Sequence, residues 1–107
     1  MSDGTVAEVL AAMADPTRRA LLDSLAAGGE ASATALSTGL PVTRQAVVKH
    51  LAVLERAGLV TPRREGREVR YALRPAPLAD AASWLGGLAA EWDARTRDGD
   101  GVGSAGR

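Results

Sequence analysis

The chain has 107 residues, which suffices for one small domain and is too short for two. Its 13 basic and 13 acidic residues cancel, so net charge alone indicates no partner. The absence of cysteine excludes a disulfide framework, a thiolate metal site and a cysteine nucleophile. No apolar stretch approaches the roughly 20 residues of a membrane span, and the first residues lack the basic start of a secretion signal. We therefore expect a cytoplasmic protein with no membrane partner.

Residue types that cap helices precede each of the first three expected helices. At the start of the first helix, Thr5 and Glu8 have the spacing of a capping box. Pro16 suits the first position of the second helix, where no backbone donor is needed. Gly28-Gly29 is typical of a helix end. The first two expected helices span 6–14 and 16–27 and are capped by Thr5 and Asp15. Ser32 can cap a short third helix with apolar positions Ala33, Leu36 and Leu40, which Gly39 and Pro41 interrupt.

A tight turn through Gly39-Leu40-Pro41-Val42 separates the third helix from a fourth, whose cap is Thr43. Gly58 stands where a left-handed C-cap is required. The apolar stripe that should face the core consists of Val47, Leu51 and Leu54.

Two stretches of alternating polarity follow, over 59–64 and 68–73, and Glu65-Gly66-Arg67 joins them. This pattern predicts a β-hairpin, in which Pro62 marks an edge strand. The expected fold is therefore mainly α with a small β-hairpin, a winged helix-turn-helix in the order α-α-α-α-β-β-α.

Residues 78–95 form the last expected helix, because apolar residues recur in it at intervals of three and four. Within it, Gly86-Gly87 indicates either a close helix contact or a kink. Trp84 fits the core or a dimer contact better than a ligand platform. We expect one domain over 1–97 and a disordered, Gly-rich tail over 98–107. The stripe exceeds the needs of one small core, which predicts a homodimer through Leu78, Ala81, Leu85, Leu88 and Trp92.

Positive charge is concentrated in the fourth helix and the hairpin. Residues 44–74 hold eight basic and three acidic side chains, whereas the segments on either side are net acidic. A basic hairpin directly after a helix-turn-helix is typical of a wing that contacts DNA phosphates. The arginines available for this are Arg63, Arg64, Arg67 and Arg70.

The start of the fourth helix carries side chains that suit the major groove of double-stranded DNA. The Arg44 guanidinium can form two hydrogen bonds to guanine, and the Gln45 amide can do the same with adenine. The Thr43 hydroxyl can form a hydrogen bond to a phosphate or a base. One turn further on, Val48 can meet a thymine methyl group. The alternative is that Thr43 only caps the helix and its two neighbours are merely solvated.

Three runs together resemble the ArsR-type winged helix-turn-helix transcriptional repressors. They are residues 14–22 (ADPTRRALL), 43–60 (TRQAVVKHLAVLERAGLV) and 66–73 (GREVRYAL). The resemblance implies a dimer through the first and last helices, which adds Leu10 to the expected interface. It also implies a palindromic operator, repression relieved by an effector, and backbone contacts from Lys49 and His50.

The chain departs from the metal-sensing members of that family. Their third helix carries a Cys-x-Cys box, whereas residues 33–37 here read ATALS. The last helix offers Asp80 and Glu91, which lie about 16 Å apart along a helix axis, and no histidine. The sequence therefore predicts no metal and no cofactor, and the effector is left unknown.

Catalysis is not expected. His50 is the sole histidine, and its helical neighbours provide neither a nucleophile nor an orienting carboxylate. A structural role or a phosphate contact is expected of it instead. A winged helix can instead serve as a protein-interaction module without specific DNA binding. Such a module should present an apolar or acidic face, whereas the face expected here is basic.

Overall fold

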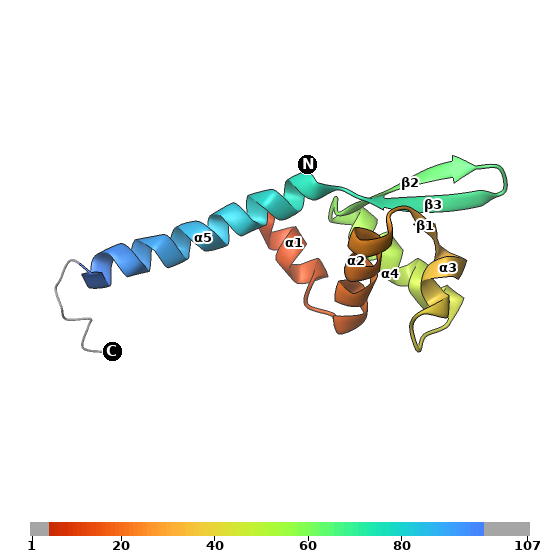
Figure 1. Cartoon of the computed structure of the whole chain (residues 1–107), viewed down its shortest axis with the longest axis horizontal. Coiled ribbons are helices and arrows are strands. Elements are labelled where there is room, and N and C mark those ends of the chain that lie inside the picture. The colour runs from red at the N-terminus through yellow and green to blue at the C-terminus, as the bar shows by residue number, and fades with distance from the viewer. Residues whose placement is uncertain (1–4, 98–107) are drawn as a thin grey trace.

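The computed structural model describes residues 5–97, and it confirms the mainly helical winged helix-turn-helix fold. The expected disordered tail lies outside the described residues. In Figure 1, α1 to α4 form a compact head, the β2–β3 hairpin extends from one side of it, and α5 projects from the other side. The elements are α1 (Val6–Ala12), α2 (Pro16–Gly28), β1 (Ala31–Ser32), α3 (Ala33–Thr38), α4 (Arg44–Arg56), β2 (Val60–Glu65), β3 (Glu68–Leu73) and α5 (Pro75–Arg97).

All four predicted N-caps of the first four helices are confirmed. In each, a side-chain oxygen accepts a hydrogen bond from the backbone N–H three residues later, at 3.0 to 3.2 Å. The capping residues are Thr5, Asp15, Ser32 and Thr43. Gly58 follows the C-cap of α4 with a φ of 80°, a left-handed conformation that favours glycine, as its position predicts.

The sheet has three antiparallel strands in the order β1-β3-β2. Pro62 therefore lies on an edge strand, as predicted, and Gly66 at the hairpin turn has a φ of 64°. The sequence did not predict β1, because two residues are too few to show alternating polarity. β1 pairs Ala31 with Tyr71, which attaches the base of the wing to the segment between α2 and α3.

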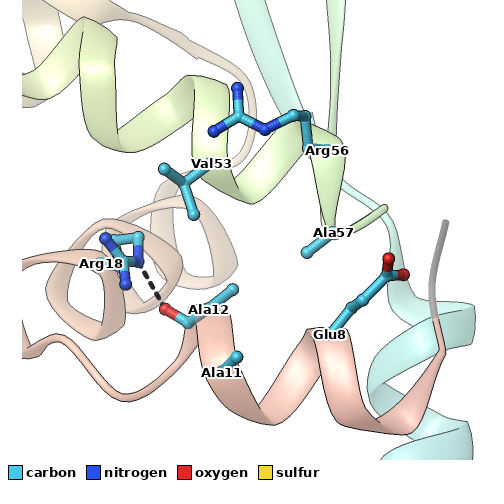
Figure 2. A pocket seen from close by; sticks show the side chains of 7 residues that line it. All are labelled: Glu8, Ala11, Ala12, Arg18, Val53, Arg56 and Ala57. Carbon is cyan, nitrogen blue, oxygen red and sulfur yellow. Dashed lines mark hydrogen bonds between the residues drawn. The ribbon is translucent and has the colours of Figure 1, made fainter. Parts of the chain in front are cut away.

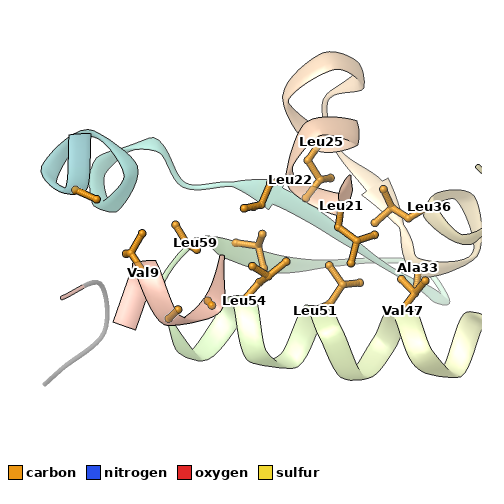
Figure 3. Packing of buried hydrophobic residues seen from close by; sticks show 14 residues of the cluster. Val9, Leu21, Leu22, Leu25, Ala33, Leu36, Val47, Leu51, Leu54 and Leu59 are labelled. Atoms are coloured by element: carbon orange, nitrogen blue, oxygen red, sulfur yellow. The ribbon is translucent and has the colours of Figure 1, made fainter. Parts of the chain in front are cut away.

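The core lies between α2, α3 and α4 under the sheet, where leucine and valine side chains interdigitate (Figure 3). The predicted stripe of α4 is fully buried, with Val47, Leu51 and Leu54 each 0% exposed. Burial of this stripe fixes the rotation of α4 about its own axis. As a result the intervening side chains at 45, 48 and 49 face solvent.

The last helix begins at Pro75, three residues before the predicted start. Prolines fit there because the first N–H groups of a helix have no internal acceptor. Two residues of the predicted dimer stripe are covered within a single protomer instead. Ala81 is only 4% exposed, and Leu78 packs against the core. The helix runs through Gly86-Gly87, and a Cβ added at either would meet nothing within 4 Å. These glycines therefore mark no close contact within one protomer.

Beyond Ala81, the stripe continues along α5 but has no covering element in the described chain. We call the uncovered residues the apolar face; they are Leu10 on α1 (37% exposed) and Trp84 (48%), Leu85 (47%), Leu88 (49%) and Trp92 (63%) on α5.

Among the described helices, none combines the length and the apolar character that crossing a membrane requires.

Candidate nucleic-acid interface

The N-terminal half of α4 presents polar side chains to solvent. The Thr43 hydroxyl accepts a hydrogen bond from the Ala46 N–H at 3.0 Å, so it performs the capping role. Gln45 and Lys49 are exposed, and neither has a side-chain hydrogen bond within residues 5–97. Val48 is 37% exposed. This half of α4 therefore combines amide, ammonium and aliphatic groups on one accessible surface.

A groove of about 320 Å³ lies between the start of α4 and the wing. Arg44 and Val48 line it from the α4 side and Arg67 from the wing. Arg44 Nε donates to Thr34 Oγ1 at 3.1 Å, which orients the guanidinium across the groove. Thr34 is not among the site residues expected from the sequence, so its hydroxyl is an addition to the candidate site.

Two of the four wing arginines are engaged by carboxylates. Arg63 donates from Nε to Glu30 Oε2 at 3.2 Å and from a terminal nitrogen to the other oxygen, and it also contacts Glu65 at 3.3 Å. Arg70 lies 3.6 Å from carboxylate oxygens of Glu30 and Glu65 and 3.4 Å from Glu68. The hydrogen bond from Arg63 lowers the pKa of Glu30, and Glu30 raises the pKa of Arg63. These pairs hold the wing against the segment that follows α2.

The other two wing arginines, Arg64 and Arg67, are exposed near the turn of the hairpin. In the part of the chain that the structure describes, neither forms an ion pair or a side-chain hydrogen bond. Within the described residues, the wing therefore carries two carboxylate-paired cations in the middle of its strands and two unpaired cations nearer its turn.

His50 is occupied by intramolecular contacts. Its Nδ1 lies 3.4 Å from Arg18 Nη1 and 3.8 Å from Asp15 Oδ2, and its side chain is 25% exposed. The Arg18 backbone N–H is the main cause of the lowered pKa of Asp15, and the charges of His50 and Arg18 add to it. The imidazole therefore joins α4 to the first turn of α2, a structural role whose partners, Arg18 and Asp15, the sequence did not identify.

Within 5–97, no three His, Asp or Glu side chains converge on a point where a metal ion would bind. The exposed face of α4 followed by the β2–β3 hairpin is the arrangement that defines the winged helix-turn-helix class of DNA-binding proteins.

Comparisons with known proteins agree with that class. Residues 13–63 match the family model described as a helix-turn-helix domain. Over 86% of both chains, the structure resembles an ArsR-like transcriptional regulator from Rhodococcus sp. RHA1, with a TM-score of 0.74 and 44% identity. The chain is also 41% identical over 89 residues to the transcriptional regulator CmtR of Mycobacterium tuberculosis, covering 79% of this chain and 71% of CmtR. It is 31% identical to the transcriptional repressor SdpR of Bacillus subtilis, covering 72% of this chain and 84% of SdpR.

The chain belongs to the ArsR family of winged helix-turn-helix transcriptional repressors. It is accordingly a DNA-binding transcriptional regulator and not an enzyme, as the sequence predicted.

Proposed function

We propose that the protein is a homodimeric repressor that reads an inverted-repeat operator with the N-terminal half of α4. The observation that carries this proposal is the rotation of α4, which buries Val47, Leu51 and Leu54 and presents residues 44, 45, 48 and 49 together. An α-helix presented in this way fits the major groove. The DNA that such a regulator binds lies in the cytoplasm of a bacterial cell, which is where we place the protein.

Base reading is assigned to Arg44, Gln45 and Val48, because their groups match the edges of guanine, adenine and thymine. Thr43 and Lys49 are assigned to the phosphate backbone near the same end of α4. His50 contributes by holding α4 against Asp15 and Arg18 rather than by direct contact.

On the wing, phosphate contact is assigned to Arg64 and Arg67, which have no carboxylate partner within residues 5–97. Arg63 and Arg70 are assigned a positioning role, because Glu30 and its neighbours already neutralise them. The groove between Arg44 and Arg67 is then the path of one DNA strand between helix and wing.

The apolar face supports the dimer. Four large side chains of α5 are about half exposed or more, which is a surface that soluble monomers rarely present in one stripe. A second copy covers this face if the two α5 helices pack about a two-fold axis. The same axis relates two α4 helices and so requires an operator with two-fold symmetry.

Selection of bound sites from a pool of random duplexes tests the proposal. We expect an inverted repeat whose half-sites lie about one helical turn, 34 to 36 Å, or a multiple of it apart. Two chains should bind each site. Selected sequences without symmetry, or one chain per site, would contradict the dimeric arrangement, and the absence of any enriched sequence would contradict specific reading.

A further inference from the structure

A second hollow lies on the opposite end of α4 from the DNA interface. This pocket has a volume of about 510 Å³ and opens between α1, the first turn of α2 and the last turns of α4 (Figure 2). The volume falls within the range of small-molecule sites. Its walls combine four methyl-bearing side chains from α1 and α4 with three charged ones, Glu8, Arg18 and Arg56.

The charged groups give the pocket a net positive lining. In Figure 2, Arg18 lies to the left of the opening, Arg56 above it and Glu8 to the right. Arg18 Nε donates to Ala12 O at 2.6 Å, which fixes that guanidinium at the rim. Arg56 has no side-chain hydrogen bond or ion pair within residues 5–97, so its five donors are available to a ligand. One oxygen of Glu8 faces the Thr5 N–H at 3.4 Å as part of the capping box.

We propose that this pocket binds a small organic carboxylate, with its carboxylate on Arg56 and its apolar body on Ala11, Ala12, Val53 and Ala57. A guanidinium presents two parallel N–H donors to a carboxylate, and the adjoining methyl groups favour a ligand with an apolar part.

The pocket lies where a ligand can influence DNA binding, an effect that rests on the proposed function. The pocket lies between α1 and the C-terminal half of α4. The N-terminal half of the same helix forms the proposed DNA interface. Arg18 contributes to the pocket and also lies 3.4 Å from His50 on α4. Suppose that a ligand binds the protein more tightly in one arrangement of α4 than in another. It can then change operator affinity by at most the ratio of its own affinities for the two arrangements.

The proposed dimer leaves the pocket open. With 3.6 residues per turn, Leu10 lies roughly 160° around α1 from Glu8. The side of α1 that contributes to the apolar face is therefore opposite the side that lines the pocket. A carboxylate can then enter the dimer from solvent without separating the subunits.

Titration of the full-length ¹⁵N-labelled protein with benzoate tests the site, and benzamide, which has nearly the same shape without charge, is the matched control ligand. We expect saturable shifts in the amides of residues 8–12 and 53–57, with a dissociation constant in the millimolar range or below. Benzamide, and benzoate with Arg56→Gln, should each bind at least about tenfold more weakly. Arg95→Gln removes the same charge from α5 outside the pocket and should leave benzoate binding unchanged.

Three results would overturn the site: no saturable shift up to about 50 mM, equal shifts from benzoate and benzamide, or equal weakening by Arg56→Gln and Arg95→Gln. A second titration measures operator affinity with and without saturating benzoate, where we expect a change of about threefold or more that Arg56→Gln abolishes. Unchanged affinity with benzoate bound would overturn the regulatory role alone. Benzoate binding without any DNA binding would contradict the proposed function and leave the site intact.

Discussion

Replacing two leucines of the apolar face with alanine should weaken the proposed dimer by a predictable amount. Leu85 and Leu88 are 47% and 49% exposed in the protomer, so about half of each side chain remains for a partner to bury. Full burial of a leucine is worth about 1.5 to 3 kcal/mol, so the remaining half is worth about 1 kcal/mol. The double variant Leu85→Ala/Leu88→Ala removes four such side chains from a dimer. We expect a loss of about 4 kcal/mol, or roughly a thousandfold in dissociation constant.

Sedimentation equilibrium over a range of protein concentrations measures this change, and circular dichroism checks that helix content is retained. Val48→Ala is the matched control, because Val48 is also a partly exposed aliphatic residue, at 37%, but lies on α4. Its dissociation constant should equal that of the wild type. Wild-type protein that is monomeric at about 10 μM, or a double variant within threefold of the wild type, would refute the assignment of this face to a second copy.

Three further outcomes are expected. Glu30→Gln/Glu65→Gln removes both carboxylates that contact Arg63, so the slope of log affinity for random duplex against log salt should steepen by about one unit; an unchanged slope would show that these pairs do not limit phosphate contact. The pKa of Asp15 is lowered from 3.8, so the stability that it contributes is present above that pH and is lost as the pH falls through the lowered pKa. Asp15→Asn keeps a cap but cannot titrate, so its melting temperature should fall less than that of the wild type between pH 4 and pH 2, and equal falls would exclude Asp15 as a cause. Calorimetric titration with zinc should detect no stoichiometric submicromolar site, and finding one would show that ligands were overlooked.

Local signals in the sequence predicted every helix, the β2–β3 hairpin and the orientation of α4, but not β1. Thr43 caps α4 through a contact three residues away, and Val47, Leu51 and Leu54 recur with the period of the helix. Both signals depend on neighbouring residues alone, which is why they are readable without a structure. The exposed surface at Gln45 follows from them directly.

Contacts between distant residues were not predictable from local patterns. Glu30 and Arg63 are 33 residues apart, and the sequence offers no spacing rule that pairs a carboxylate after α2 with a wing arginine. This pairing is the reason that we propose a positioning role for Arg63 in place of the phosphate contact expected from the sequence. His50 and Arg18 are 32 residues apart, and their proximity has the same origin in tertiary packing. Ala81 fitted the periodicity of the apolar stripe, but only the position of α1 shows that the head of the same protomer already covers it.

The most direct test of DNA reading by α4 compares Gln45→Ala with Arg67→Ala on the selected operator and on random duplex, each over a range of salt concentrations. Gln45→Ala should cost about 1 to 3 kcal/mol on the operator and much less on random duplex, with an unchanged salt slope. Arg67→Ala should weaken binding to both duplexes alike and lower the slope by about one unit. Equal losses on operator and random duplex for Gln45→Ala would contradict base reading and leave α4 as an electrostatic anchor.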